Sequence, residues 1–383
     1  MTDRAGSRGR VEGALLELLA HRRRLRDAPP PDARFRGPEV IRAGLQRWMG
    51  DEHGPHARVS DLRRLSGAGT NELYAFTLHR GGTRESLVLR VKVPGSGVVT
   101  HLGREVQAMR AVDGLIPVPR PRWSTHDARY LGAPAVVTDF SPGVQAPRGQ
   151  ATRASGMGTR YPEPLRSKLA PQFVTYEALL HAFDLRRADL DTFEPPRAGT
   201  TDAVDWRLAF WDRVWDEDRL EEHPSMSLAR DWLWEHRPVV DVVSLLHGDY
   251  RNGNFLFDEE RGVVTAVIDW EMTWIGDRHA DLAYTMFKSF GHVEDGVTLV
   301  AGLLEAGRFV AAYEEVSGLP VDPERLHYYF VFNMYWSNIS LLATGLRNAA
   351  AGMTQLDVMY QAMAGKGAMS CAALNRVLFG GAR

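Results

Sequence analysis

The stretch His247-Gly248-Asp249-Tyr250-Arg251-Asn252-Gly253-Asn254 is the most informative part of this sequence about fold, together with two apolar runs that follow it. The first run, Phe255-Leu256-Phe257, comes at once, and the second, Val267-Ile268-Asp269-Trp270, places Asp269 fifteen residues after Asn254. This spacing, His-x-Asp-x-x-x-x-Asn with an Asp at the end of a later apolar strand, is typical of a catalytic loop for phosphoryl transfer. A hairpin with turn-forming Asp and Asn residues explains any one of these positions but not the set.

The residue types in this stretch suit such chemistry. An Asp on the loop can accept a hydroxyl proton, so Asp249 is the candidate catalytic base. The amide oxygen of Asn254 and the carboxylate of Asp269 are hard oxygen ligands of the kind that magnesium prefers. We therefore predict that Asn254 and Asp269 bind the metal.

Composition excludes several classes of protein. The chain has 383 residues, 44% of them hydrophobic, which is enough for a buried core and excludes disordered, collagen-like and disulfide-rich proteins. Its 46 basic and 48 acidic side chains nearly balance, which gives no field for steering nucleic acid. The chain has one cysteine, Cys371, and it shows neither an apolar run long enough to cross a bilayer nor a secretory signal. We therefore predict a cytoplasmic protein without membrane or nucleic-acid partners.

Three segments differ in pattern along the chain. Residues 1–35 combine a short helix with a proline run and look like an N-terminal appendage. Residues 36–140 predict an opening helix and then strands and one further helix in the order β-β-β-α-β-β. That helix is expected at Leu102 to Val112 and the last strand at Ala135 to Asp139. Residues 141–383 predict mostly helices, with one short sheet-like interruption around Asn254 to Trp270.

With these motifs the chain resembles the aminoglycoside phosphotransferase and choline kinase group of small-molecule kinases. More narrowly, it resembles the phosphotransferases related to kinase domains attached to some acyl-CoA dehydrogenases. The resemblance rests on HGDYRNGNFLFD, VIDWEMTWIGDRHADLAY, LVLRV and REVQAMRAV, and it extends over about residues 36 to 383. It implies an α+β bilobal protein-kinase-like fold, with a small β-rich N-lobe at 36–140 for the nucleotide and a larger helical C-lobe at 141–383 for catalysis and substrate.

The resemblance also implies cofactors and roles. ATP and Mg²⁺ would be the cofactors and a small molecule with a hydroxyl group the acceptor, with Asp249 as base and Asn254 and Asp269 as magnesium ligands. The adenine would lie against the strand 135–138 and hydrogen-bond the backbone around Asp139 and Phe140. Asp-Trp-Glu stands where protein kinases have Asp-Phe-Gly, so their activation switch is not expected here.

A cation for the nucleotide phosphates is predicted on the run Leu87-Val88-Leu89-Arg90. Val88, Arg90 and Lys92 share one face of this strand, so Lys92 competes with Arg90 if the register differs. We favour Arg90, with Glu105 in the following helix as its ion-pair partner. An ordinary exposed helical carboxylate is the alternative for Glu105.

A phosphate-binding loop is predicted at Ser66, Gly67, Gly69 and Thr70, between two strands. Glycines allow close backbone approach to phosphates, and the hydroxyl groups can add hydrogen bonds. The loop lacks the full Gly-x-Gly-x-x-Gly pattern, so a plain hairpin turn is the alternative.

Arg251, two residues after the candidate base, has two possible catalytic roles. Its guanidinium could neutralise charge on the transferred phosphoryl group or bind an acidic substrate. A structural salt bridge is the alternative. We further expect Asp281 to accept hydrogen bonds from the catalytic loop, His247 to brace that loop, and His181 to be a core histidine.

The acceptor is the open question. The narrower resemblance suggests a hydroxylated acyl or carboxylic metabolite, and the broad family suggests an aminoglycoside or another antibiotic. An aminoglycoside needs a dense acidic surface, for which the stretch Asp212 to Glu222 is the candidate. Acceptor binding is expected on the C-terminal helices, including the aromatic stretch Tyr328 to Trp336 unless it is plain core, with the segment after Gly143 as a possible lid. A non-catalytic nucleotide-binding protein is the remaining alternative.

Overall fold

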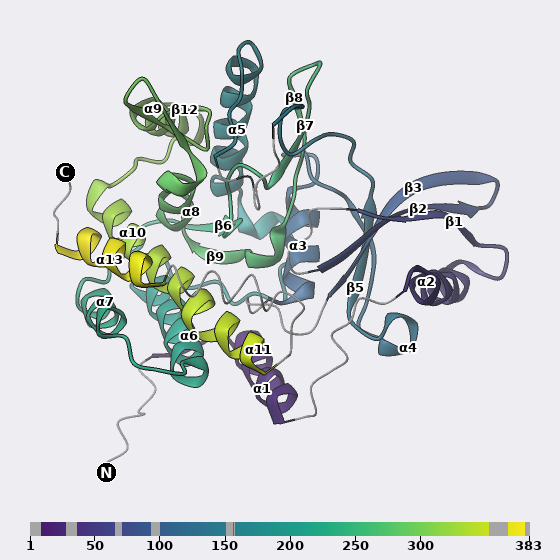
Figure 1. Ribbon diagram of the computed structural model, residues 1–383, viewed down its shortest axis with the longest axis horizontal. Coiled ribbons are helices and arrows are strands. Elements are labelled where there is room, and N and C mark those ends of the chain that lie inside the picture. Colours follow the sequence, from purple (N-terminus) through teal and green to yellow (C-terminus); the bar gives the residue numbers. More distant parts are fainter. Residues whose placement is uncertain are drawn as a thin grey trace.

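The computed structural model describes residues 9–27, 37–65, 71–92, 100–150, 156, 158–351 and 367–379. Figure 1 shows a curved sheet with two helices at one side, the single helix α3 beside it, and a larger, mostly helical part on the other side. The predicted α+β organisation, with a β-rich first half and a helical second half, is confirmed.

The first half forms an antiparallel five-stranded sheet in the order β1-β2-β3-β5-β4. Its strands are β1 (Arg58–Arg64), β2 (Asn71–Arg80), β3 (Thr83–Lys92), β4 (Pro121–Thr125) and β5 (Ala135–Asp139). One face packs against α2 (Pro38–His53) and α4 (Ala128–Leu131), which share a buried apolar cluster with it. The predicted order along the chain, β-β-β-α-β-β, is found, with the unpredicted short helix α4 between β4 and β5.

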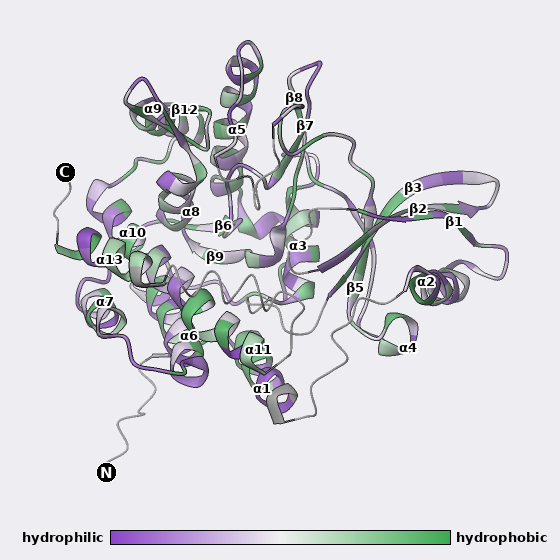
Figure 2. Ribbon diagram, in the orientation of Figure 1, coloured by the Kyte–Doolittle hydropathy of each residue, from purple (hydrophilic) through white to green (hydrophobic). Residues whose placement is uncertain are grey.

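Alternation along β3 separates the two faces of this sheet. Leu87, Leu89 and Val91 are buried in the cluster beneath α2, because successive side chains of a strand point to opposite faces. Arg90 and Lys92 consequently lie on the face turned toward the second half of the chain. The outer end of the β2–β3 hairpin is hydrophilic, as Figure 2 shows.

Helix α3 spans Leu102–Val112, the range that the sequence predicts. Leu102 and Val106 pack against Val136 of β5, which fixes the helix on the open face of the sheet. Glu105, one turn into the helix, is fully buried. The alternative of an exposed helical carboxylate is therefore wrong.

The second half is built around helices with short strands between them. The helices are α5 (Leu165–His181), α6 (Asp202–Asp218), α7 (Pro224–Glu235), α8 (His279–Thr285), α9 (Ala306–Ser317), α10 (Pro323–Asn338), α11 (Leu346–Ala350) and α13 (Gly367–Phe379). The strands are β6 (Val243–Leu246) paired with β9 (Trp274–Asp277), β7 (Phe255–Asp258) paired with β8 (Val263–Val267), and the small sheet of β10 (His292–Glu294), β11 (Val297–Val300) and β12 (Leu304–Glu305). The single sheet-like interruption predicted around Asn254 to Trp270 corresponds to β7 and β8. The other short strands of this half were not predicted.

The aromatic stretch of α10 belongs mainly to the core. Tyr328, Tyr329, Phe332 and Tyr335 are at most 2% exposed and pack with α6, α7 and α13. Their helical spacing reflects this burial, so the aromatic character of the stretch needs no ligand to explain it.

The N-terminal segment contributes to the same core. Val11, Leu15 and Leu19 are buried in the same apolar cluster as residues of α6, and Arg22 of α1 (Gly13–Asp27) forms an ion pair with Asp218 of α6 at 2.6 Å. Glu12 also forms a buried ion pair with Arg104 of α3. The described part of the predicted appendage is thus integrated into the fold.

Candidate active site

The catalytic loop predicted from the sequence connects β6 to β7, and Asp281 of α8 holds its start. One Asp281 oxygen accepts the backbone N–H of His247 at 2.7 Å, and the other accepts that of Gly248 at 2.9 Å. Asp281 is 1% exposed, so these bonds are shielded from water. The structural role predicted for Asp281 is confirmed.

His247 braces the loop as a neutral side chain. Its Nε2 lies 3.0 Å from the carbonyl oxygen of Ile268, which can only accept, so Nε2 carries the proton. Its Nδ1 therefore accepts the backbone N–H of Asp249 at 3.2 Å. Burial lowers the pKa of His247, which agrees with the neutral form. The ring thus joins the loop to the segment before Asp269.

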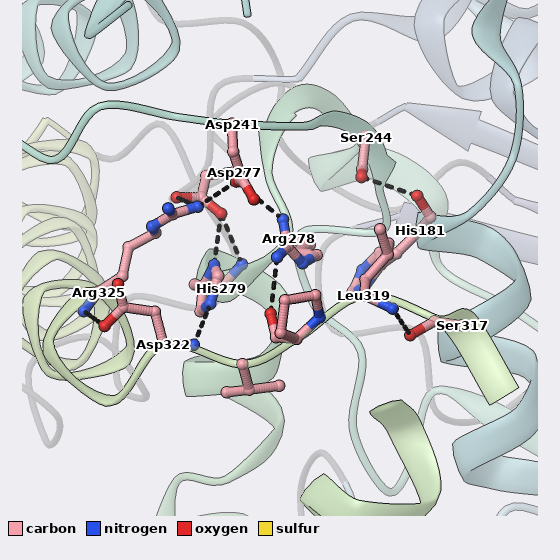
Figure 3. Close-up of polar contacts among 12 residues, drawn as sticks. His181, Asp241, Ser244, Asp277, Arg278, His279, Ser317, Leu319, Asp322 and Arg325 are labelled. Atoms are coloured by element: carbon pink, nitrogen blue, oxygen red, sulfur yellow. Dashed lines mark hydrogen bonds and ion pairs between the residues drawn. The ribbon is translucent and has the colours of Figure 1, made fainter. Parts of the chain in front are cut away.

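A buried polar network sets the position of α8 (Figure 3). Asp277 accepts from the backbone N–H of His279 and from its Nδ1 at 2.7 Å, and His279 Nε2 accepts the N–H of Asp322 at 3.0 Å. Arg278 donates to Asp241 at 3.2 Å and to the carbonyl oxygen of Pro320 at 2.7 Å. These bonds tie the first turn of α8 to the start of α10, and so fix Asp281.

His181 of α5 completes this support. Its Nε2 lies 3.3 Å from Asp281 and its Nδ1 lies 3.0 Å from the hydroxyl of Tyr313, with the ring 1% exposed. The prediction of a core histidine is confirmed.

Asp249, the candidate base, is held by two neighbours on its own loop. Arg251 donates through Nε at 2.6 Å and through Nη2 at 3.1 Å, and Asn254 donates through Nδ2 at 2.6 Å. Arg251 also lies 5.0 Å above the ring of Phe290. Although burial opposes it, the charge of Asp249 holds the pKa of Arg251 above its ordinary value. Tyr284, which the sequence analysis missed, lies beside this pair and interacts with both members.

The two predicted metal ligands meet at the end of the β7–β8 hairpin. The backbone N–H of Ile268 donates to the carbonyl of Asn254 at 2.9 Å, which brings Asp269 next to Asn254. Asp269 adopts a left-handed conformation with φ 68° and ψ 54°, which is uncommon for a residue other than glycine. Burial, Glu271 and Asp249 raise the pKa of Asp269 to about 7.

These carboxylates fit a divalent cation. Asp249, Asp269 and Glu271 repel one another at close range, and the amide nitrogen of Asn254 is used by Asp249, which leaves its oxygen for a metal ion. In the described part of the chain, no three His, Cys, Asp or Glu side chains form a metal cage. Magnesium is usually held by one or two protein oxygens together with substrate phosphates, so the donor set suits it.

Cations from the sheet face these carboxylates. Arg90 forms an ion pair with Glu105, as predicted, and Lys92 lies 3.4 Å from the other oxygen of Glu105. Both cations therefore share one buried carboxylate. Burial lowers the pKa of Lys92 to about 8. Asn71 of β2 also donates to Glu271 at 3.1 Å, a direct bond between the sheet and the second half.

The predicted adenine site lies at the end of β5. Val88 of β3 pairs with Thr138 of β5 and lies on the same face of β3 as Arg90. The backbone N–H of Asp139 donates to the carbonyl oxygen of Arg120 at 3.0 Å, and that of Phe140 donates to the carbonyl oxygen of Ser86 at 3.1 Å. The amide donors of Asp139 and Phe140 are thus used within the sheet. An adenine base placed here would have to hydrogen-bond the carbonyl oxygens of these two residues or the backbone of the residues after Phe140. The predicted adenine contacts are therefore limited to those groups.

The structure describes the start of the predicted lid but not the predicted phosphate-binding loop. Ser66, Gly67, Gly69 and Thr70 lie outside the described residues. The segment after Gly143 begins with a bridge in which Val144 and Phe257 of β7 exchange backbone hydrogen bonds at 2.9 and 3.0 Å. Gln145 then donates to the carbonyl of Gly253 at 2.7 Å. The start of the predicted lid is therefore hydrogen-bonded to β7 and to the catalytic loop.

The site as a whole brings Asp249, Asn254, Asp269 and the half-buried cations Arg90 and Lys92 to the junction of the two halves. The family model of the phosphotransferase enzyme family matches residues 61–319. The chain belongs to this family. The predicted family and the predicted enzyme class, a phosphotransferase, are confirmed.

Curated relatives extend this finding. The mouse protein acyl-CoA dehydrogenase family member 10 is 28% identical over 210 residues, which are 52% of this chain and 18% of that protein. The Arabidopsis thaliana protein named probable acyl-CoA dehydrogenase IBR3 is 24% identical over 292 residues, 70% of this chain and 34% of that protein. The chain thus spans 18% and 34% of the length of these two relatives. The narrower resemblance predicted from the sequence is confirmed.

A solved structure supports the fold. A putative aminoglycoside phosphotransferase from Ralstonia eutropha superposes with a TM-score of 0.63 at 20% identity, over 87% of this chain and 97% of that protein. In the described part of this chain, no helix is both long and apolar enough to cross a membrane.

Proposed function

We propose that this phosphotransferase moves the γ-phosphoryl group of ATP to a hydroxyl group of a small hydroxylated acyl or carboxylic metabolite. The observation that carries the proposal is the position of Asp249, fixed by Asn254 and Arg251 beside Asp269, opposite the cations Arg90 and Lys92. A base, two hard oxygen ligands and two cations are the parts that phosphoryl transfer from a nucleotide requires.

Each group has a task in this mechanism. The carboxylate of Asp249 orients the acceptor hydroxyl and takes its proton as the oxygen attacks. Arg90 and Lys92, held by Glu105, bind the nucleotide phosphates. Asn254 and Asp269 would hold magnesium, which supplies charge neutralisation on the phosphate oxygens when bound.

The acidic stretch considered for aminoglycosides is largely neutralised. Asp216 pairs with Arg230 at 3.1 Å, Asp218 with Arg22 at 2.6 Å and Glu222 with Arg219 at 2.9 Å. Asp212 is 7% exposed and faces the core. Paired and buried carboxylates give little field for a polycation, and this favours the acyl or carboxylic acceptor over an antibiotic. The names of the curated relatives, acyl-CoA dehydrogenases, favour it as well.

The test incubates wild type, Asp249→Asn and Asp189→Asn with magnesium and ATP and a pooled set of hydroxy acids, their CoA thioesters, aminoglycosides and macrolides. Phosphorylated products are sought by mass spectrometry. Asp189 is exposed and serves as the matched control. A phosphorylated acid or thioester with wild type and the control, absent with Asp249→Asn, supports the proposal. A phosphorylated antibiotic would replace the acceptor class, and ATP binding without any product would favour a non-catalytic protein.

A further inference from the structure

A small recess adjoins the catalytic loop, with walls from α6, α8 and α10. Gly248, the residue before Asp249, and Asp281 form part of its lining. The recess has about 250 Å³ of empty space, part of which is open solvent, and its enclosed part has room for about one water-sized group. It therefore suits the end of a chain and is too narrow for a sugar ring.

Arg207 of α6 lines this recess and lacks an ordinary partner. The residue is 9% exposed, and its guanidinium lies 5.3, 5.4 and 5.0 Å from the rings of Phe210, Trp211 and Trp274. Among the residues that the structure describes, none accepts a hydrogen bond from it or pairs with its charge. Burial lowers its pKa to about 10, so it remains a cation at neutral pH.

The charged groups around Arg207 are engaged elsewhere. Glu12 and Asp281 are the nearby acids and Arg104 the nearby cation. Glu12 pairs with Arg104, and Asp281 accepts from the loop amides and contacts His181. Because a buried charge without a partner is costly, an anion from outside the chain would stabilise Arg207.

A second unsatisfied donor lines the same recess. Trp211 is 1% exposed, and its indole Nε1–H finds no acceptor within the described ranges. Asn333, also in the lining, already donates to Ala280 at 2.8 Å and accepts from Trp336 at 2.9 Å. Buried donors in native proteins are almost always paired, so an unpaired guanidinium in the lining, with the buried unpaired indole N–H of Trp211 beside it, indicates a ligand that supplies acceptors.

We propose that Arg207 and Trp211 bind a carboxylate carried by the phosphoryl acceptor. The inference rests on the proposed function and adds to it the residues that select the acceptor. A carboxylate has one negative charge and two small acceptor atoms, so one oxygen can enter the enclosed part while the rest of the group stays in the open part of the recess. A phosphate dianion fits less well because the carboxylate of Asp281 lines the same recess. The acceptor hydroxyl then has to reach Asp249, which follows the lining residue Gly248 in the chain.

The test compares wild type with Arg207→Met, Arg207→Lys and Trp211→Phe. Arg213→Met is the matched control on the same helix, because Arg213 has only a long contact of 3.4 Å to Gly9. The probes are straight-chain hydroxycarboxylates of three to six carbons, each beside its primary amide. Steady-state kinetics with magnesium and ATP give kcat and KM, and calorimetry gives binding without turnover.

We expect Arg207→Met to raise KM for the acids about 10- to 100-fold, the loss typical of a hydrogen bond to a charged group, and to leave the amides unchanged. Arg207→Lys should recover part of the affinity because it retains the charge, and Trp211→Phe should lose a few-fold. Thermal melting of each variant separates loss of binding from loss of folding.

The outcomes separate this inference from the proposed function. If acids bind wild type but not Arg207→Met and no probe is phosphorylated, the inference holds and the function fails. If wild type phosphorylates the acids and Arg207→Met does so equally well, the function holds and the inference is overturned. Equal effects on acids and amides, or no binding of any acid to wild type, also overturn it.

Discussion

Arg251 donates to both carboxylate oxygens of Asp249, through Nε at 2.6 Å and through Nη2 at 3.1 Å. An ionised carboxylate has about four acceptor positions, and Asn254 takes a third. About one position is left for an incoming hydroxyl group, and a shift of Arg251 when the acceptor binds would free more of the carboxylate. Its guanidinium is then free to turn toward the transferred phosphoryl group.

Arg251→Met tests this role. If Arg251 neutralises charge on the phosphoryl group, kcat should fall about 10²- to 10³-fold with little change in the acceptor KM. If it binds an acidic acceptor instead, KM should rise. Steady-state kinetics with Arg251→Lys alongside separates the two roles, and unchanged turnover and affinity in Arg251→Met would exclude both.

Asp281→Asn should loosen the catalytic loop. The asparagine side chain would have one acceptor oxygen in place of the two that meet the N–H groups of His247 and Gly248 and the ring of His181. We therefore expect the free energy of unfolding to fall by about 2–3 kcal/mol and kcat to fall as well. Urea denaturation and kinetics measure the two effects. Asp189→Asn, at an exposed position, should change neither. A fall in kcat without any loss of stability would mean that Asp281 does more than hold the loop.

Lys92 should be unusually reactive toward acylating reagents. Burial lowers its pKa to about 8, so half of its amine is unprotonated near that pH, whereas a free lysine titrates near about 10.4. Acetylation over a pH series, read by peptide mass spectrometry, should rise through about pH 8 at Lys92 and later for N-acetyl-lysine. ATP should protect Lys92 if it faces the phosphates. Labelling parallel to the free amino acid would contradict the low pKa.

Asp212 should make stability depend on pH. Burial raises its pKa to about 6 despite hydrogen bonds from Trp234 at 2.7 Å and Tyr335 at 2.8 Å. Between about pH 4 and pH 6 the folded chain keeps a proton that the unfolded chain releases, so stability falls as pH rises, by up to about 3 kcal/mol. Wild type should therefore lose stability relative to Asp212→Asn over this range. A constant difference between the two would show that Asp212 titrates alike in both states.

The catalytic elements could be predicted because their signals are local. Asp249, Asn254 and Asp269 stand in one stretch of sequence, and α3 and β5 have the bounds that their apolar patterns predict. The strands β10 to β12 were missed because two to four residues show no alternation. A pattern along one segment also cannot reveal which chain segments approach it in space.

Arg207 and Trp211 illustrate that limit. In the sequence they are ordinary members of an amphipathic helix, and only the approach of α8, α10 and the catalytic loop leaves them at a recess without acceptors. The two cations of β3 are a further case. The sequence analysis chose between Arg90 and Lys92, but the strand and α3 are close enough for Glu105 to contact both.

The ion pair between Glu12 and Arg104 links the N-terminal segment to α3, one residue away from Glu105. A chain shortened to begin at residue 36 would keep every predicted cleft residue. It would nevertheless leave the guanidinium of Arg104, now 3% exposed, without its carboxylate, and it would remove Val11, Leu15 and Leu19 from the core. A fragment that keeps this support for α3 and Glu105 therefore has to include the N-terminal segment, which lies far in the sequence from the motifs around Arg90 and Asp249.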